Sequence, residues 1–169
     1  MRRSTPQATK LAVPGNHDHW RDIDTIEQEL MRHHIGVLRN EVVNASGIII
    51  AGLDDDFTGK ADLELVVRKI RAAARRAVIL SHSPDLFPDL PADTGIMLAG
   101  HTHCGQIGWP WGGSSATMSK YGQRYACGVV EEDGNVLVTS AGLGTSVLPF
   151  RLFTQPEIWG IDLADRAAK

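Results

Sequence analysis

The sequence predicts a mixed α/β domain, and three observations lead to this class. Short apolar runs of strand length recur along the chain and alternate with amphipathic stretches in its first half. Several of these runs end at glycine or serine and lead directly into polar residues, as buried parallel strands do. Finally, 169 residues with 43% hydrophobic and 22% charged side chains suit one globular domain with a substantial core.

The domain is expected to begin after a loose N-terminus. Residues 1–9 are polar and lack apolar periodicity, so residues 10–169 are taken as a single domain. Apolar runs predict the strands of that domain. They are residues 10–13, 36–39, 48–53, 77–80, 96–99, 125–131, 135–140 and 158–163.

Two segments have helical periodicity. Residues 22–34 place Ile23, Ile26 and Leu30 on one face, and Gly36 is a suitable stop. Residues 61–74 form a second apolar stripe of the same kind. Later in the chain antiparallel pairing takes over, because Asp133-Gly134 between two apolar runs is a strong hairpin signal.

Bulk composition excludes some classes of function. The formal net charge of −3 offers no electrostatic basis for binding nucleic acid. The sequence contains no run of about 18 apolar residues, so no transmembrane span is predicted and a cytoplasmic location is expected for the chain as written. Two cysteines do not make a disulfide framework. Cys127 is expected to be a small buried hydrophobe, and Cys104 either packs or supplies a thiolate beside a metal.

Three apolar runs end in residues that bind metals. Asn16 follows the first strand, His82 follows the run at 77–80, and His101 and His103 follow the run at 96–99. Each residue alone is most simply a turn or surface residue. Together, at the same end of parallel strands, they predict a metal site of Asn16, His82, His101 and His103 suited to Zn, Mn or Fe.

Two further residues are candidates for catalysis. His17 follows Asn16 at a strand-to-helix turn, from which it can protonate a leaving oxygen or stabilise phosphoryl charge. Asp18 either orients His17 or simply caps the following helix. His19, His33 and His34 are interpreted as surface or helix-face residues.

The order of these motifs resembles the calcineurin-like metallophosphoesterases, over about residues 10–163. The similarity is closest to a bacterial branch that continues Gly-His-Thr-His with a glutamine, here Gln106. The matching segments are Gly15-Asn16-His17-Asp18, Ser81-His82, Gly100-His101-Thr102-His103, Gly105-Gln106, residues 121–125, residues 142–146 and residues 149–152. The branch normally has glycine at the position of Cys104.

The resemblance implies a sandwich of two sheets flanked by helices and a centre of two divalent ions that hydrolyses phosphomono- or phosphodiesters. By position, Asn16, His82 and His101 match ligands of one metal and His103 a ligand of the other. His17, supported by Asp18, matches the histidine that acts on the substrate phosphate. A metal-activated hydroxide is the implied nucleophile.

One departure from the family concerns the start of the chain. Members carry Asp-x-His and Gly-Asp-x-x-Asp before Gly-Asn-His-Asp, and nothing in residues 1–10 matches either motif. The chain is therefore expected to be N-terminally truncated relative to that pattern. The remaining ligands are neutral, and two dications about 3.5–4 Å apart repel by roughly 19 kcal/mol at an effective dielectric of 20. One ion or none is expected in this chain alone.

Alternatives remain open. The chain is either an active phosphoesterase or a catalytically impaired metal-binding module that needs the missing segment. Asp54, Asp55 or Asp56, which follow a strand, offer replacement carboxylates, or else form a solvated turn. A zinc hydrolase of another type is a further alternative, because amidohydrolases also use His-x-His. Their β/α barrel needs ~250 residues, more than this chain has. A metallo-β-lactamase-like site would require Asp and His soon after His103, where the sequence has Gly105 and Gln106.

The substrate itself cannot be inferred beyond a phosphate ester. Trp109, Trp111 and the apolar residues 148–150 either line an approach for a membrane-proximal or lipid-linked substrate or pack as ordinary loop aromatics. If these residues line the approach for such a substrate, the complete protein is expected to be membrane-associated.

Overall fold

A six-stranded mixed sheet forms the centre of the protein, and a separate pair of strands lies near the N-terminus. The structure is a computed structural model that describes residues 8–164. The strands are β1 (Leu11–Ala12), β2 (Gly36–Val37), β3 (Glu41–Ala45), β4 (Ile48–Gly52), β5 (Ala77–Leu80), β6 (Gly95–Ala99), β7 (Gly128–Glu132) and β8 (Asn135–Thr139). The helices are α1 (Asn16–Trp20), α2 (Ile23–Arg32) and α3 (Leu63–Ala72), with 3-10 turns at Pro84–Asp89 and His103–Gly105. The predicted mixed α/β class is confirmed.

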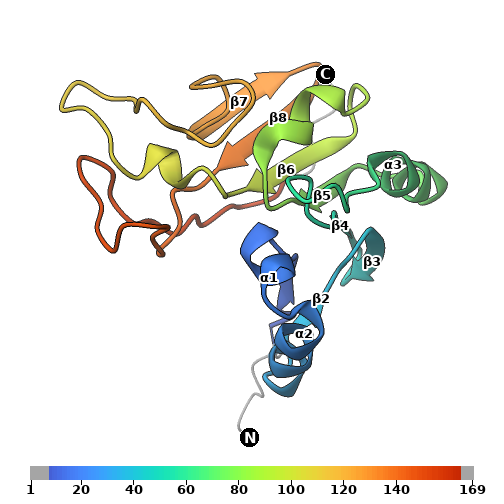
Figure 1. Cartoon of the computed structure of the whole chain (residues 1–169). Coiled ribbons are helices and arrows are strands. Elements are labelled where there is room, and N and C mark those ends of the chain that lie inside the picture. The colour runs from blue at the N-terminus through green and yellow to red at the C-terminus, as the bar shows by residue number, and fades with distance from the viewer. Residues whose placement is uncertain (1–7, 165–169) are drawn as a thin grey trace, which may run out of the picture.

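The central sheet has the order β3-β4-β5-β6-β8-β7. Its four inner strands, β4, β5, β6 and β8, are parallel, and antiparallel partners close both sides. The parallel pair β1–β2 lies with α1 and α2 below the central sheet in Figure 1. Because parallel strands end at the same edge of a sheet, the residues after β4, β5 and β6 are brought together there.

The core lies between the sheet and α3. Ala51, Ile79, Met97 and Leu137 occupy successive inner strands and are fully buried. The stripe of α3 that packs with them is the one predicted from its periodicity, and it consists of Val66, Val67 and Ile70.

Local signals account for the boundaries of the helices and hairpins. Asp22 and Asp62 cap α2 and α3, since each side chain accepts a hydrogen bond from the backbone N–H three residues on. Asp133-Gly134 turns between β7 and β8 with positive φ at both residues (49° and 72°), the conformation that such a two-residue hairpin needs. The predicted hairpin is confirmed.

Two strand predictions differ from the structure. The sequence analysis missed β3, whose mixed polarity gives a weak signal but which pairs with β4 along its whole length. The strand predicted at 158–163 is wrong, because that segment has no regular structure. Ile161 and Leu163 line the same cavity as Ile96 and Val136, whose strands are already paired on both sides and offer no free edge.

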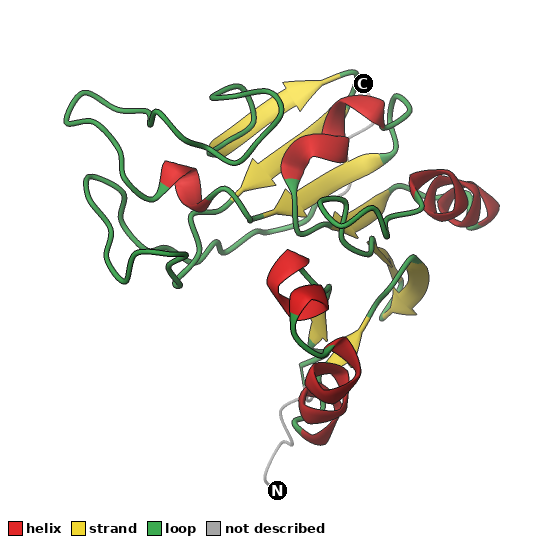
Figure 2. Ribbon diagram, in the orientation of Figure 1, coloured by secondary structure: helices red, strands yellow, loops and turns green. Residues whose placement is uncertain are grey.

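Two long loops extend from the carboxyl edge of the sheet. One follows β6 and the other follows β8, and Figure 2 shows both as irregular segments at the same end of the molecule. They touch at Ile107 and Leu152, where the N–H of Gly108 also donates to the carbonyl of Leu152 at 2.8 Å. Among residues 8–164, no helix is long and apolar enough to cross a bilayer. The predicted loose N-terminus lies mainly in residues 1–7, outside the described residues.

Candidate metal centre

Three of the predicted ligands meet at the carboxyl edge of the strands. His82 Nε2 lies 2.9 Å from Asn16 Oδ1 and 2.9 Å from His101 Nδ1. They come from α1 after β1, from the residue pair after β5, and from the turn after β6. Thus segments separated by 66 and 19 residues converge on one point.

The donor set of this cluster fits a divalent cation. His82 Nε2 carries at most one proton, so it cannot satisfy both the amide oxygen of Asn16 and the ring nitrogen of His101 as a donor. A cation between the three atoms would instead accept a lone pair from each of them. Asn16 is also 2% exposed, so its oxygen is held in place rather than solvated.

Burial keeps these imidazoles neutral. It lowers the pKa of His82 to about 4, and the neighbouring His101 acts in the same direction while Asp55 opposes it. Burial also lowers the pKa of His101 and of His103. Neutral imidazole is the form that ligates metals, so protons compete weakly with a cation at this site near neutral pH.

A close backbone approach fixes the ring of His82. A Cβ atom built on Gly15 would lie 2.5 Å from His82 Cε1 and 2.6 Å from its Nδ1. The ring therefore lies flat against the backbone that leads into α1. Asp18 caps that helix, because its Oδ2 accepts the N–H of Gly15 at 2.8 Å. The predicted role of Asp18 as a cap of the following helix differs from the structure, because Asp18 lies within α1 and Asp22 caps α2.

Replacing Gly15 by alanine should therefore displace His82. Gly15 has φ −119°, which alanine adopts freely, so the effect comes from the clash alone. A ring shift of about 1 Å is expected to lower hydrolysis roughly 100-fold, with a parallel loss of metal affinity measured by calorimetry. Gly160→Ala is the matched control, since a Cβ atom there meets open space. Equal metal affinity in both variants would refute the steric argument.

His103 lies in the same turn but has a different partner. Its Nδ1 lies 3.2 Å from Gln106 Oε1, and Gln106 is held in turn by the carbonyls of Leu148 and Phe150. Among the described residues, no hydrogen bond joins His103 to the Asn16–His82–His101 cluster. The structure thus brings three of the four predicted ligands into direct contact and leaves the ring of His103 beside them.

His17 is exposed on the outer side of α1. Its Nε2 lies 3.4 Å from Ser146 Oγ in the loop after β8, and its ring is 5.0 Å from that of Trp20. Trp20 contacts Phe57, and Phe57 lies 5.3 Å from the ring of His101. His17 and His101 are therefore bordered by the same row of aromatic rings.

His19 corrects the sequence analysis. It was interpreted as a surface or helix-face residue, but its side chain is 8% exposed and its Nε2 lies 2.6 Å from Asp54 Oδ1. The second oxygen of Asp54 accepts from Arg39 Nε at 2.8 Å. This buried network attaches α1 to the turn after β4, and its carboxylate is fully occupied by protein partners. Histidine and aspartate 35 residues apart carry no sequence signal of such a pair.

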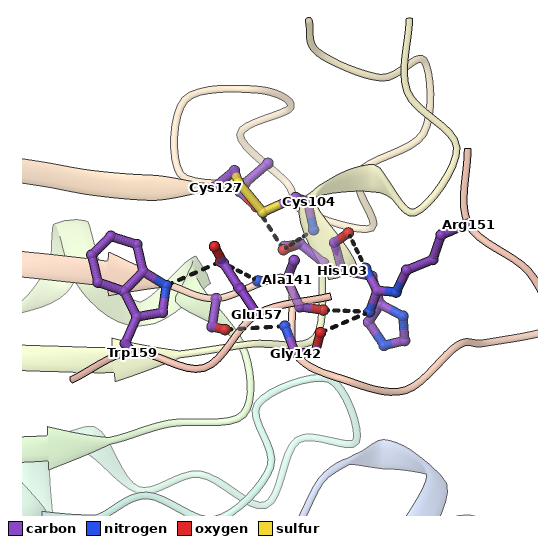
Figure 3. The surroundings of a disulfide bond; sticks show 11 residues. His103, Cys104, Cys127, Ala141, Gly142, Arg151, Glu157 and Trp159 are labelled. Carbon is purple, nitrogen blue, oxygen red and sulfur yellow. Dashed lines mark hydrogen bonds between the residues drawn. A yellow bond between two sulfur atoms is a disulfide. The ribbon is translucent and has the colours of Figure 1, made fainter. Parts of the chain in front are cut away.

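The cysteines also correct the sequence analysis. Cys104 and Cys127 form a disulfide, so neither is a free packing residue or thiolate, and Cys127 is exposed rather than buried. The bond ties the turn after His103 to the residue before β7 (Figure 3). Thr102 Oγ1 reinforces the same connection by donating to the carbonyl of Ala126 at 2.7 Å.

Removing the disulfide should lower stability. The bond closes a loop of 23 residues, for which the chain-entropy model gives about 3 kcal/mol. The double variant Cys104→Ser/Cys127→Ser should lose about that free energy of unfolding in urea titrations. Wild-type protein treated with dithiothreitol is the matched comparison and should unfold like the variant. Unchanged stability of the wild type after confirmed reduction would contradict this expectation.

Arg151 is a structural residue that the sequence analysis did not single out by role. Its guanidinium donates to backbone carbonyls of the two loops rather than to a carboxylate (Figure 3). The acceptors are the carbonyls of His103, Ala141, Gly142 and Gly144. Arg151 thereby connects the turn of His103 to the loop that contacts His17.

Comparison with known proteins finds relatives that are described as metallophosphoesterases. The chain is 30% identical over 167 residues to YkuE of Bacillus subtilis, described as an uncharacterized metallophosphoesterase. The chain is similar to members of the metallophosphoesterase family. Other uncharacterized metallophosphoesterases of this family are 30% identical in Helicobacter pylori strain J99, over 154 residues, and 27% identical in Aquifex aeolicus, over 160 residues.

These matches cover most of this chain but a smaller share of each relative. They cover 94%, 86% and 90% of this chain, but 57%, 40% and 60% of the relatives from B. subtilis, H. pylori and A. aeolicus. The chain thus spans about half the length of the curated relatives it matches. No family model and no solved structure matches it. The family implies divalent metal ions in general.

Proposed function

We propose that this chain carries a metal-dependent phosphoesterase site that hydrolyses phosphomono- or phosphodiesters. The observation that supports it best is the meeting of Asn16 Oδ1, His82 Nε2 and His101 Nδ1 around one point. When bound there, a divalent ion such as Mn, Zn or Fe supplies Lewis-acid activation of water and of the phosphoryl group.

The protein's own residues then have distinct tasks. Asn16, His82 and His101 hold the ion, and His103 completes its surroundings. His17 is exposed next to the cluster, where it can hold a proton for the leaving oxygen. Asp18 fixes the helix that carries His17, through its bond to Gly15. The Ser146 hydroxyl next to His17 Nε2 orients the ring from the opposite loop.

We propose that the site holds a single ion in this chain. All four candidate ligands, Asn16, His82, His101 and His103, are neutral, so they do not offset the repulsion between two adjacent dications. The alternative, a catalytically impaired fragment or metal-binding module that needs a further segment, holds one ion or none and has no turnover. Two ions per chain would exclude this alternative and favour the complete two-metal centre of the family.

Exposed apolar side chains on the two loops bear on the class of substrate. Trp109 and Trp111 stack 5.4 Å apart and are 47% and 80% exposed, and Leu148 and Phe150 are exposed on the loop opposite. Exposed apolar side chains of this size favour a phosphate ester with an apolar or lipid-linked group. A membrane-proximal location of the complete protein would follow.

The test is hydrolysis by a folded, purified sample. Bis(p-nitrophenyl) phosphate and p-nitrophenyl phosphate are offered with Mn, Zn or Fe, and metal content is measured by mass spectrometry. Metal-dependent release of nitrophenol with one ion per chain supports the proposal. One ion per chain without turnover supports the metal-binding module. A folded sample that retains no metal would overturn the phosphoesterase site and favour the impaired fragment.

A further inference from the structure

The two ring nitrogens of His101 have different surroundings. Nδ1 faces His82 at 2.9 Å, whereas Nε2 is buried and has no hydrogen-bond partner among residues 8–164. A neutral imidazole carries its proton on one of these nitrogens. If Nδ1 is to offer a lone pair to a cation, the proton must be on Nε2. A buried N–H without an acceptor costs about 1–3 kcal/mol, so this tautomer needs an acceptor behind the ring.

Asp55 is a fully buried carboxylate with one oxygen to spare. It is 0% exposed, and its Oδ2 accepts the N–H of Thr58 at 2.7 Å. Its Oδ1 is buried and has no partner in the described part of the chain. A half-satisfied buried carboxylate is costly, and such groups are normally paired. Asp55 therefore needs a donor as much as His101 Nε2 needs an acceptor.

The fold places the turn of Asp55 against His101. This turn follows β4, which is next to β5 in the parallel sheet, and Leu53 N donates to the carbonyl of Leu80 at 2.9 Å. Phe57, two residues after Asp55, lies 5.3 Å from the His101 ring. Asp55 is also the charge that most strongly raises the pKa of His101 against the effect of burial.

The other carboxylate near His101 is already occupied. Asp85 acts on the pKa of His101 less strongly than Asp55 does. Its two oxygens accept from the hydroxyl of Ser119 and, at 2.9 Å, from the N–H of Lys120. Of the two carboxylates, only Asp55 has an oxygen free of protein donors in the described structure.

We propose that Asp55 is a positioning residue that accepts the Nε2 proton of His101, across at most one water molecule. This contact holds His101 in the tautomer whose Nδ1 lone pair faces Asn16 and His82. Metal-ligating histidines commonly donate their second nitrogen to a carboxylate in this way, which fixes the ring and increases its basicity. The inference deepens the proposed function, on which its role in metal binding rests.

Thr58 offers a competing explanation that the test must separate. Its Oγ1 is also buried without a partner among the described residues, and it belongs to the same turn as Asp55. A small rotation of this hydroxyl could satisfy Asp55 Oδ1 without involving His101. Thr58→Val removes that hydroxyl and leaves the backbone N–H that Asp55 Oδ2 accepts. It should leave the His101 tautomer unchanged if Asp55 pairs with His101.

The decisive measurement is the tautomer of His101 in metal-free protein, read from the ring ¹⁵N shifts by long-range NMR correlation near pH 7.5. The wild type is expected to carry the proton on Nε2. Asp55→Asn retains an oxygen for the Thr58 N–H but directs an amide donor towards His101, so the proton should move to Nδ1. Wild-type protein with the proton on Nδ1, or an unchanged tautomer in Asp55→Asn, would overturn the proposal.

Metal affinity gives an independent reading. Asp55→Asn should bind Zn²⁺ about 10–100-fold more weakly than wild type or Thr58→Val, at unchanged melting temperature. Equal affinity in all three proteins would overturn the role of Asp55 in metal binding. The tautomer is measured without metal or substrate, so absence of phosphoesterase activity would count against the proposed function and leave the Asp55–His101 contact standing.

Discussion

Replacing His101 by alanine is expected to reduce divalent-metal affinity by at least about 100-fold and to abolish metal-dependent hydrolysis. His101 contributes one of three atoms that meet at 2.9 Å, and a cation left with two neutral ligands and water is only weakly held. Isothermal titration with Zn²⁺ measures the affinity, and bis(p-nitrophenyl) phosphate measures the turnover.

Two companion variants control this experiment. His101 has φ +63°, so an alanine there also strains the backbone, whereas His82 has no such positive φ. His82→Ala should therefore give the same loss of metal without that strain. His33→Ala removes an imidazole that is 71% exposed just after α2, and this variant should bind metal like the wild type. Wild-type affinity in both site variants would remove the basis of the proposed metal centre.

Acidification of the metal-free protein from pH 7 to pH 4 should lower its free energy of unfolding by about 3 kcal/mol through the titration of His82 alone. Burial lowers the pKa of His82 from 6.5 to about 4 in the folded protein, while the unfolded chain keeps the ordinary value. Above pH 6.5 both states are neutral and the free energy of unfolding is unaffected. As the pH falls towards 4, only the unfolded state takes up the proton, so stability is lost across that window at 1.36 kcal/mol per pKa unit.

Urea unfolding at pH 7 and pH 4 in the presence of EDTA measures this loss. His82→Gln removes the titrating ring, so its stability should fall by about 3 kcal/mol less than that of the wild type. Burial raises the pKa of Asp54, but bonds from Arg39, the Asp55 N–H and His19 outweigh it and lower that pKa. Protonation of Asp54 therefore also lowers the free energy of unfolding as the pH falls. Because Asp54 is present in both proteins, it cancels in the comparison. Parallel pH profiles would show that His82 is not the group responsible.

Local sequence patterns were sufficient for most of the fold. The inner strands are continuous apolar runs, the helices have a 3.6-residue stripe and an aspartate cap, and Asp133-Gly134 favours one turn type. Each of these signals involves residues that are close together in the chain, so it can be recognised from the sequence alone. Segments with weaker local signals were misjudged, as with the polar β3 and with residues 158–163, whose apolar alternation meets no free strand edge.

The convergence of His82 and His101 followed from the sequence because parallel strands must end at one edge of their sheet. Asn16 follows β1 of the separate strand pair, so its approach to His82 depends on the packing of the start of α1 against that edge. Contacts within that edge depend on side-chain approach between distant segments, which spacing does not encode. The Cys104–Cys127 bond, the burial of His19 on Asp54, the carbonyl contacts of Arg151 and the fit of Gly15 against His82 are of this kind. Strand direction specified that His82 and His101 would meet, and the packed three-dimensional arrangement brought Asn16 to them and specified what each residue touches.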